Sequence, residues 1–284
     1  MNRLKAQEAI KNFLLEDIGD RDLSSILFSP EDWGEAVVRL KQDGVVAGLE
    51  CFLWGYNLLD PAVTVEFLKR DGDWVESGEA IVRIKGPVAS LLAGERVLLN
   101  LVQRMSAIAT LTAKCVEILN SSHTRIVDTR KTTPGLRMFE KYAVRTGGGF
   151  NHRNGLYDAV MLKDNHIAAA GSIRQAVNGV RDQLGHITMI EVEIENLAQL
   201  QEAIEARPDI IMFDNQTPET LTEWAKLVPE SIRTEASGGI GLENLAAYRH
   251  TGVDVISIGA LTHSVHNLDI SMNLSISHKE ALYQ

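Results

Sequence analysis

The chain has 284 residues, of which 45% are hydrophobic and 23% charged, and this is enough for one large α/β barrel or for two domains. The formal net charge of −10 argues against nonspecific binding to nucleic acid. No segment approaches the roughly 20 apolar residues of a membrane helix, and the first 20 residues lack the apolar core of a signal peptide. The two cysteines, Cys51 and Cys115, are expected as buried reduced thiols, so a cytoplasmic location is expected.

The first 120 residues predict helix, then sheet, then helix. Residues 1–30 indicate a helix and a polar turn, with an apolar face formed by Leu4, Ile10, Phe13 and Leu14. Residues 35–87 contain short β-rich runs separated by Asp-Gly and Ser-Gly turns, which predict a small antiparallel sheet. Residues 88–120 carry apolar residues at helical spacing, so a second helix is predicted there.

After residue 124, short apolar runs alternate with amphipathic stretches. The runs are TRIVDTRK, DAVMLKDNH, TMIEVEIEN, DIIMFDNQ, SIRTEASGG and VDVISIGALTHS. The stretches between them include SIRQAVNGVRDQLG, NLAQLQEAIEAR, TPETLTEWAKLV and GLENLAAYRHTG. This alternation predicts βα units and a parallel sheet. Six strands favour a TIM-like barrel with fewer than eight strands, and a doubly wound open sheet is the structural alternative.

Each predicted strand ends in polar or glycine residues, and the carboxyl ends of parallel strands hold the active site of α/β proteins. The cations at these ends are Arg130, Lys131, His152, Arg153, Lys163 and His263. The anions are Glu193 and Asp214, with Glu235 as a further candidate. Residues 125–166 hold eight Lys or Arg and four Asp or Glu, which predicts a basic patch and a pocket for small anions.

The last two predicted strands are followed by glycine-rich segments, SGGIG and IGALTHS. Barrel enzymes often bind a phosphate at this position, on loop amides and a helix N-terminus. The usual dinucleotide, P-loop, serine-nucleophile and zinc motifs are missing. The residues alone therefore predict an anion-binding α/β barrel enzyme that handles a phosphorylated sugar and an acid.

One long segment is specific to a known family. DTRKTTPGLRMFEKYAVRTGGGFNHRNGLYDAVMLKDNH, residues 128–166, resembles the signature of quinolinate phosphoribosyltransferase, also called carboxylating nicotinate-nucleotide pyrophosphorylase. EDIGDRDLSS, GERVLLNLVQRMSAIAT, EVE, FDN, EASGGI and IGALTHS follow the family's order along the chain. The resemblance thus extends over nearly the whole sequence.

The resemblance implies an N-terminal α/β sandwich followed by an irregular parallel α/β barrel. Residues 1–110 are expected to form the sandwich and a linker helix, and residues 111–270 the catalytic barrel. Residues 271–284 are expected as a tail that packs back on the N-terminal domain. The implied reaction converts quinolinate and phosphoribosyl pyrophosphate to nicotinate mononucleotide, pyrophosphate and CO₂, requires Mg²⁺ and serves NAD biosynthesis. The implied assembly is a homodimer or a higher oligomer with shared active sites, without nucleic acid or membrane.

The family's pattern also implies residue roles. Quinolinate's two carboxylates would be bound by Arg130, His152 and Arg153, with Arg96 from the partner subunit. Lys131 and Lys163 would lie between quinolinate and pyrophosphate. Glu193 and Asp214 would bind ribose hydroxyls, directly or through Mg²⁺, and are thus the candidate metal ligands. The 5′-phosphate region would be formed by Ser237, Gly239, Gly259 and His263.

Three other functions stay open at this point. A pyrophosphorylase-like paralogue associated with molybdenum transport shares the fold and part of the motif. A phosphoribosyltransferase acting on nicotinate is disfavoured, because nicotinate has only one carboxylate for the expected group of cations. A noncatalytic anion-binding protein is disfavoured by the presence of Lys131, Lys163, Glu193 and Asp214 together.

Overall fold

The computed structural model describes residues 1–277, which form two compact units. Of the described residues, the first unit comprises 1–111, 134–147 and 265–277, and the second comprises 112–133 and 148–264. Residues 134–147 thus belong to the first unit, although the sequence placed them in the barrel. The predicted tail of 271–284 is described only to residue 277, and residues 278–284 lie outside the described part of the chain.

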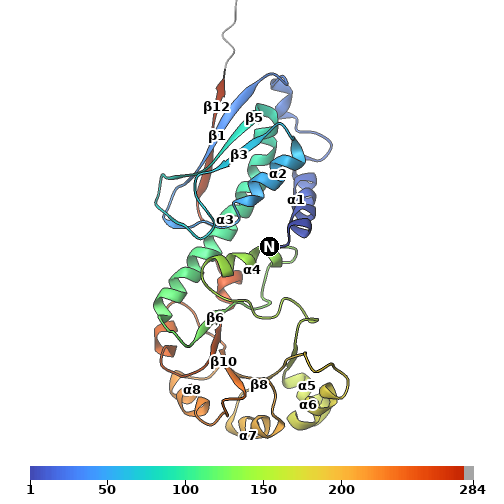
Figure 1. The fold of residues 1–284 in the computed structure, drawn as a ribbon, viewed down its shortest axis with the longest axis vertical. Helices are drawn as coiled ribbons and strands as arrows, with labels where there is room; N and C mark the ends of the chain where they lie inside the picture. Colours follow the sequence, from blue (N-terminus) through green and yellow to red (C-terminus); the bar gives the residue numbers. More distant parts are fainter. Residues whose placement is uncertain (278–284) are drawn as a thin grey trace, which may run out of the picture. The chain divides into compact units, whose positions relative to one another are not determined.

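The first unit contains a four-stranded antiparallel sheet in the order β12-β1-β5-β3 (Figure 1). Its strands are β1 (Trp33–Leu40), β3 (Thr64–Phe67), β5 (Ala80–Pro87) and β12 (Ile270–Ser277). A small pair, β2 (Gly44–Val45) and β4 (Trp74–Val75), accompanies the sheet. β12 comes from the far end of the sequence and pairs with β1 along the whole length of both strands.

The helices of the first unit are α1 (Arg3–Ile18), α2 (Glu50–Leu59), α4 (Arg137–Thr146) and the long α3 (Val88–Leu119). The last residues of α3 belong to the second unit. A short 3-10 turn, η1 (Ser24–Leu27), follows α1. The sequence did not predict α2. This helix approaches α3 so closely that a Cβ on Gly55 would lie 2.3 Å from Leu98 Cδ2. The prediction for Leu4 was wrong, because its side chain is 79% exposed. Ala6, Ile10 and Leu14 form the buried stripe at a spacing of four residues, and Leu4 falls outside it.

The second unit contains a six-stranded parallel sheet in the order β6-β11-β10-β9-β8-β7. The strands are β6 (Arg125–Val127), β7 (Val160–Leu162), β8 (Ile190–Ile194), β9 (Ile210–Asp214), β10 (Arg233–Ser237) and β11 (Val255–Ser257). All six arise from the predicted apolar runs. β8, β9 and β10 are buried along most of their length, as expected for a parallel sheet covered on both faces.

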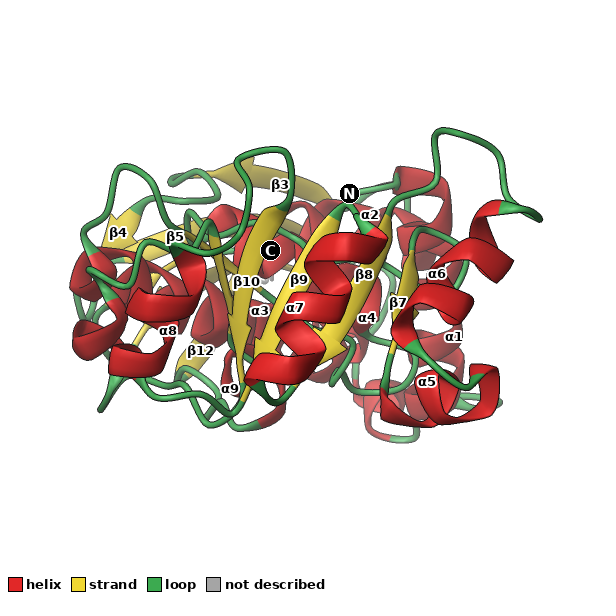
Figure 2. Cartoon of the chain, turned by 90° about the horizontal axis from the view of Figure 1, so that it is seen from below, coloured by secondary structure: helices red, strands yellow, loops and turns green. Residues whose placement is uncertain are grey.

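Helices α5 (Asp164–Ala170), α6 (Ile173–Arg181), α7 (Leu197–Ala206) and α8 (Pro218–Ala225) connect these strands, and α7 lies across β8 and β9 (Figure 2). The last predicted helix is only a 3-10 turn, η2 (Leu245–Tyr248), before the short α9 (Ala260–His263). Asn244 bonds to Gly239 and Gly241 in a tight turn, which leaves few residues for a helix before β11.

β6 and β7 are the two edges of this sheet within the described chain. Phe150 forms a parallel bridge to Val127 of β6. The segment that precedes β7 therefore covers the outer edge of β6 at this point. The predicted fold class, an antiparallel-sheet domain with an irregular parallel α/β domain, is confirmed. The two cysteines are buried free thiols, as expected. Of the helices in residues 1–277, none combines the length and apolar character needed to cross a membrane.

Candidate active site

A pocket of about 500 Å³ opens at the carboxyl ends of the parallel strands, entirely within the second unit. Its walls are formed by Thr129, Arg130, Lys131, His152, Arg153, Met161, Lys163, Glu193, Met212, Asp214, Asn215, Glu235, Ser237, Gly238, Gly239 and Ser257. This is the edge of the sheet that the polar strand ends predicted. Nine of the predicted site residues therefore line one cavity: Arg130, Lys131, His152, Arg153, Lys163, Glu193, Asp214, Ser237 and Gly239.

Strand geometry explains which strand residues face the pocket. Side chains of a strand alternate between its two faces, so residues two apart project to the same side. Met212 and Asp214 on β9 both line the pocket, and Met212 pairs with Glu193 on one side and with Glu235 on the other. Asp214 pairs with Ser237 one step nearer the mouth. The register therefore places carboxylates from three adjacent strands on one wall.

Cations come mainly from the segments that flank β6 and β7. Arg130 Nη1 is buried and has no hydrogen-bond partner within residues 1–277. Arg153 Nη1 donates to the carbonyl of Ala159 at 2.9 Å. Burial and the nearby charge of Arg130 lower the pKa of Arg153 below its ordinary value, while Glu191 opposes the lowering. Two guanidinium groups that repel each other in a pocket create a site for an anion.

Carboxylates dominate the opposite part of the pocket. Lys163 Nζ forms an ion pair with Glu193 Oε2. Burial raises the pKa of Asp214, and the charge of Glu193 raises it further, with Lys163 acting in the opposite direction. The side chain of Asn215 donates to Asp214 at 2.7 Å. Asn215 has a positive φ of 54°, and a Cβ on Gly238 would lie 2.2 Å from its Oδ1, so this turn requires glycine at 238.

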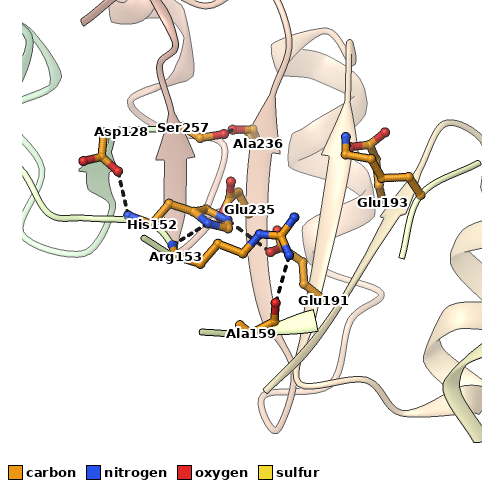
Figure 3. A network of polar contacts seen from close by, with 10 residues as sticks. Asp128, His152, Arg153, Ala159, Glu191, Glu193, Glu235, Ala236 and Ser257 are labelled. Atoms are coloured by element: carbon orange, nitrogen blue, oxygen red, sulfur yellow. Dashed lines mark hydrogen bonds and ion pairs between the residues drawn. The ribbon is translucent and has the colours of Figure 1, made fainter. Parts of the chain in front are cut away.

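Beside the cations, the half-buried His152 converges with the buried Glu191 and Glu235 (Figure 3). His152 Nε2 lies 3.1 Å from Glu191 Oε2 and 3.6 Å from Glu235 Oε2. Burial and the charge of Glu191 raise the pKa of Glu235 to about 7. These potential ligand atoms lie within 4.8 Å of one another, but the nitrogen donor and the adjoining Arg153 suit Mg²⁺ poorly.

The remaining predicted residues lie outside the pocket lining. Gly259 and His263 adjoin Lys131: a Cβ on Gly259 would lie 3.0 Å from His263 Nε2 and 3.2 Å from Lys131 Cδ. Arg96 is exposed on α3 and belongs to the first unit. Of the cations in residues 125–166, Arg130, Lys131, Arg153 and Lys163 line the pocket, whereas Arg137, Lys141 and Arg145 stand on α4 in the first unit.

Sequence reasoning missed several residues that shape the site. Asp128 is fully buried, and its carboxylate accepts from the His152 backbone N–H at 2.9 Å and from the Asn151 side chain at 2.6 Å. Glu191 supports His152 from below. Both residues stand among the polar strand ends, so the signal was present. Both residues contact His152, which lies 24 residues after Asp128 and 39 residues before Glu191. Spacing along the chain does not predict contacts over such separations.

Comparisons with known proteins agree along the whole chain. Residues 22–106 match the N-terminal domain of quinolinate phosphoribosyl transferase, and residues 108–273 match its C-terminal domain. A relative from Bacillus subtilis, named probable nicotinate-nucleotide pyrophosphorylase (carboxylating), is 53% identical over 98% of this chain and 96% of its own length. A relative of the same name from Synechocystis is 46% identical over 93% of this chain and 91% of its own.

Solved structures give the same result. NadC from Streptococcus pyogenes superposes with a TM-score of 0.94 at 41% identity, covering 98% of this chain and 99% of that one. A human nicotinic acid phosphoribosyltransferase, at 16% identity and a TM-score of 0.63, covers 100% of this chain and 76% of that one and shares the fold alone. The paired domain matches and the full-length relatives together show that this chain belongs to the quinolinate phosphoribosyl transferase family.

Proposed function

We propose that this chain transfers the phosphoribosyl group of phosphoribosyl pyrophosphate to quinolinate with loss of CO₂. The products are nicotinate mononucleotide and pyrophosphate, and the reaction serves NAD biosynthesis. The chain is thus an enzyme, a pentosyltransferase, and the relatives named carboxylating nicotinate-nucleotide pyrophosphorylase support this directly.

The observation that carries the proposal is the buried cationic end of the pocket. Arg130 has a buried Nη1 that finds no hydrogen-bond partner among the described residues, and Arg153 lies near enough for Arg130 to affect its pKa. Buried donors without partners are costly unless a ligand supplies acceptors. A dianionic pyridine dicarboxylate supplies four acceptor oxygens, so it satisfies these groups better than nicotinate does.

The other pocket residues fit the chemistry of the sugar. Departure of pyrophosphate leaves positive charge at the ribose C1, which Glu193 and Asp214 would favour electrostatically. Lys131 and Lys163 would stabilise the departing pyrophosphate. The pyridine nitrogen attacks C1, the bond to the adjacent carboxylate then breaks to release CO₂, and the electron pair left on the ring carbon, stabilised by the neighbouring pyridinium nitrogen, takes up a proton from water to give nicotinate mononucleotide. No protein nucleophile is needed in this sequence.

Two consecutive glycines support a phosphate site beside Ser237. Gly238 and Gly239 both have positive φ, 94° and 61°, and a backbone turn of this kind directs N–H groups toward an anion. We place the 5′-phosphate there, with Gly259 and His263 near Lys131 completing the region. Asp214 and Glu193 offer the carboxylate oxygens that Mg²⁺ prefers and would hold the ion together with the pyrophosphate. When bound, Mg²⁺ supplies charge neutralisation of the leaving group.

The assembly and the location belong to the same proposal. We propose a homodimer in the cytoplasm, in which Arg96 of each subunit completes the other subunit's site. Arg96 is exposed on α3, so it is available to meet a substrate carboxylate.

The test is a product assay with purified protein, phosphoribosyl pyrophosphate, Mg²⁺ and either quinolinate or nicotinate. We expect CO₂ and pyrophosphate in equal amounts from quinolinate, and little pyrophosphate from nicotinate. Lys131→Ala, Lys163→Ala and Asp214→Ala should each lower turnover at least about tenfold, or about 1.4 kcal/mol of transition-state stabilisation, with unchanged circular dichroism. Equal rates with nicotinate would contradict the specificity, and absence of CO₂ release would contradict the reaction.

A further inference from the structure

Glu191 is buried directly under the substrate pocket without lining it. Its side chain on β8 is 2% exposed, whereas the neighbouring His152 and Arg153 both line the cavity. Its Oε2 atom lies 3.1 Å from His152 Nε2, and its negative charge also acts on Arg153 (Figure 3). A single carboxylate that does not reach the cavity thus contacts or influences two groups that do.

The hydrogen bonds around His152 determine where its proton lies. His152 Nδ1 accepts from the backbone N–H of Arg153 at 2.7 Å, so this nitrogen carries no proton. The proton of a neutral imidazole must then be on Nε2, which is the nitrogen that faces Glu191. Glu191 Oε2 is the nearer of the two carboxylate oxygens to this nitrogen, because Glu235 Oε2 lies 3.6 Å away, and the contact with Glu191 is electrostatic.

The backbone of the same segment is also held in place. Asp128 accepts from the His152 N–H, and Phe150 exchanges backbone hydrogen bonds with Ile126 and Asp128 of the β6 strand region. The ring of His152 can therefore change its orientation only by rotating its own side chain. Glu191 and the Arg153 amide oppose that rotation from the two ring nitrogens.

We propose that Glu191 is a positioning residue that holds the ring of His152, in the Nε2–H tautomer set by the Arg153 N–H, and, through His152 and the charge of Arg153, arranges both residues for the substrate dicarboxylate. His152 then presents a neutral ring to the pocket, and the charge of the substrate is met by the arginines and lysines. This modifies the role expected for His152, which was grouped with the cations. Only the identity of the ligand, quinolinate, rests on the proposed function.

The tautomer can be measured without any substrate. Protein labelled with ¹⁵N at histidine should show an unprotonated Nδ1 and a protonated Nε2 for His152, whose signals are identified by their absence in His152→Ala. Glu191→Ala should leave Nδ1 unprotonated, because the Arg153 N–H still donates to it, and should shift the Nε2 signal, because the neighbouring carboxylate is gone. Glu191→Gln should shift the Nε2 signal less, because a carbonyl oxygen remains beside Nε2. Glu205→Gln, a change of an exposed carboxylate on α7, should leave the spectrum unchanged. A protonated Nδ1 in the wild type would overturn the proposal.

Steady-state kinetics test the consequence for the substrate. Glu191→Ala should raise the KM for quinolinate at least about tenfold and change the KM for phosphoribosyl pyrophosphate less than about twofold, and Glu191→Gln should restore most of the loss. A similar rise in both KM values together with a lower Tm would show a general structural defect and overturn the proposal. If the wild type does not convert quinolinate, the proposed function fails, and the ¹⁵N spectrum still decides the tautomer.

Discussion

Two buried carboxylates, Glu191 and Glu235, share the neighbourhood of one imidazole at the floor of the pocket. Full ionisation of both would place two negative charges together in a medium of low dielectric, where the repulsion is large. Burial and Glu191 therefore raise the pKa of Glu235 to about 7. The consequence is a pH dependence of stability that originates inside the site.

Glu235→Gln should reveal that dependence. In the unfolded chain the carboxyl loses its proton near its ordinary pKa of about 4.3, so between about pH 4.3 and 7 the folded state binds the extra proton. Wild-type stability should thus fall as pH rises through this window, by at most about 1.4 kcal/mol per pH unit from this group. Gln mimics the protonated form and removes the effect. Urea unfolding from pH 5 to 8 should show the variant gaining stability relative to the wild type.

The surface variant Glu205→Gln is the control for this titration, since its carboxylate is exposed on α7. Its difference from the wild type should stay constant over the same pH range. Parallel curves for Glu235→Gln and the wild type would show that Glu235 is ionised at acidic pH, contrary to the expectation.

At the scale of the elements, the pairing of β1 with β12 requires the two strands to approach closely at Gly34. It lies between β12 and β5, and Gly34 leaves no room for a side chain because a Cβ there would lie 2.9 Å from Leu274 Cδ1 and 3.0 Å from the Ser275 carbonyl oxygen. β12 joins the sheet from the end of the chain, so the pairing of β1 with β12 ties distant parts of the sequence together.

Gly34→Ala should lower the free energy of unfolding by about 1–3 kcal/mol, the usual cost of overpacking a tight site. Gly179→Ala is the matched comparison, because Gly179 lies within α6 and a Cβ there would meet no atom within 4 Å. It should raise stability by about 0.5–1 kcal/mol through helix propensity. Thermal and urea unfolding of both variants measure the difference. Equal effects would show that β1 and β12 separate enough to admit a methyl group.

At the scale of the whole molecule, we propose that Arg96 is supplied by a partner subunit. Arg96 belongs to the first unit, whereas every residue that lines the pocket belongs to the second. A two-fold dimer would let each subunit contribute Arg96 to the other by one symmetric contact.

Subunit mixing tests this arrangement. Arg96→Ala and Lys131→Ala should each be inactive alone. After verified exchange of equal amounts, half of the dimers are mixed and contain one intact site each, so about a quarter of wild-type activity should return. Recovery of no activity would mean that Arg96 acts within its own chain. Mixing Lys163→Ala with Lys131→Ala is the control and should restore nothing, since both residues line the same pocket of one chain.

The sequence by itself determined the strands of the second unit and most residues at their ends. Short apolar runs that alternate with amphipathic stretches predict a parallel sheet. Because all strands of such a sheet run in the same direction, their carboxyl ends lie at one edge, where the site is expected. Arg130, Lys163 and Asp214 therefore line the pocket as expected. The same local reasoning missed α2, because the segment was read with its β-rich neighbours and apolar residues alone do not separate a buried helix from a strand.

Only the tertiary structure decided which side chains meet. Spacing along a strand indicates the face on which a residue lies, but the neighbours across the sheet depend on strand order and register. Glu191 on β8 contacts His152, which lies on the segment that follows the edge of β6. Helix α4 belongs to the first unit, because its packing partners are there: Phe139 packs beside Phe13, and Glu140 pairs with Arg104. Such contacts join residues far apart in the sequence, and their free energy exists only after the chain has folded.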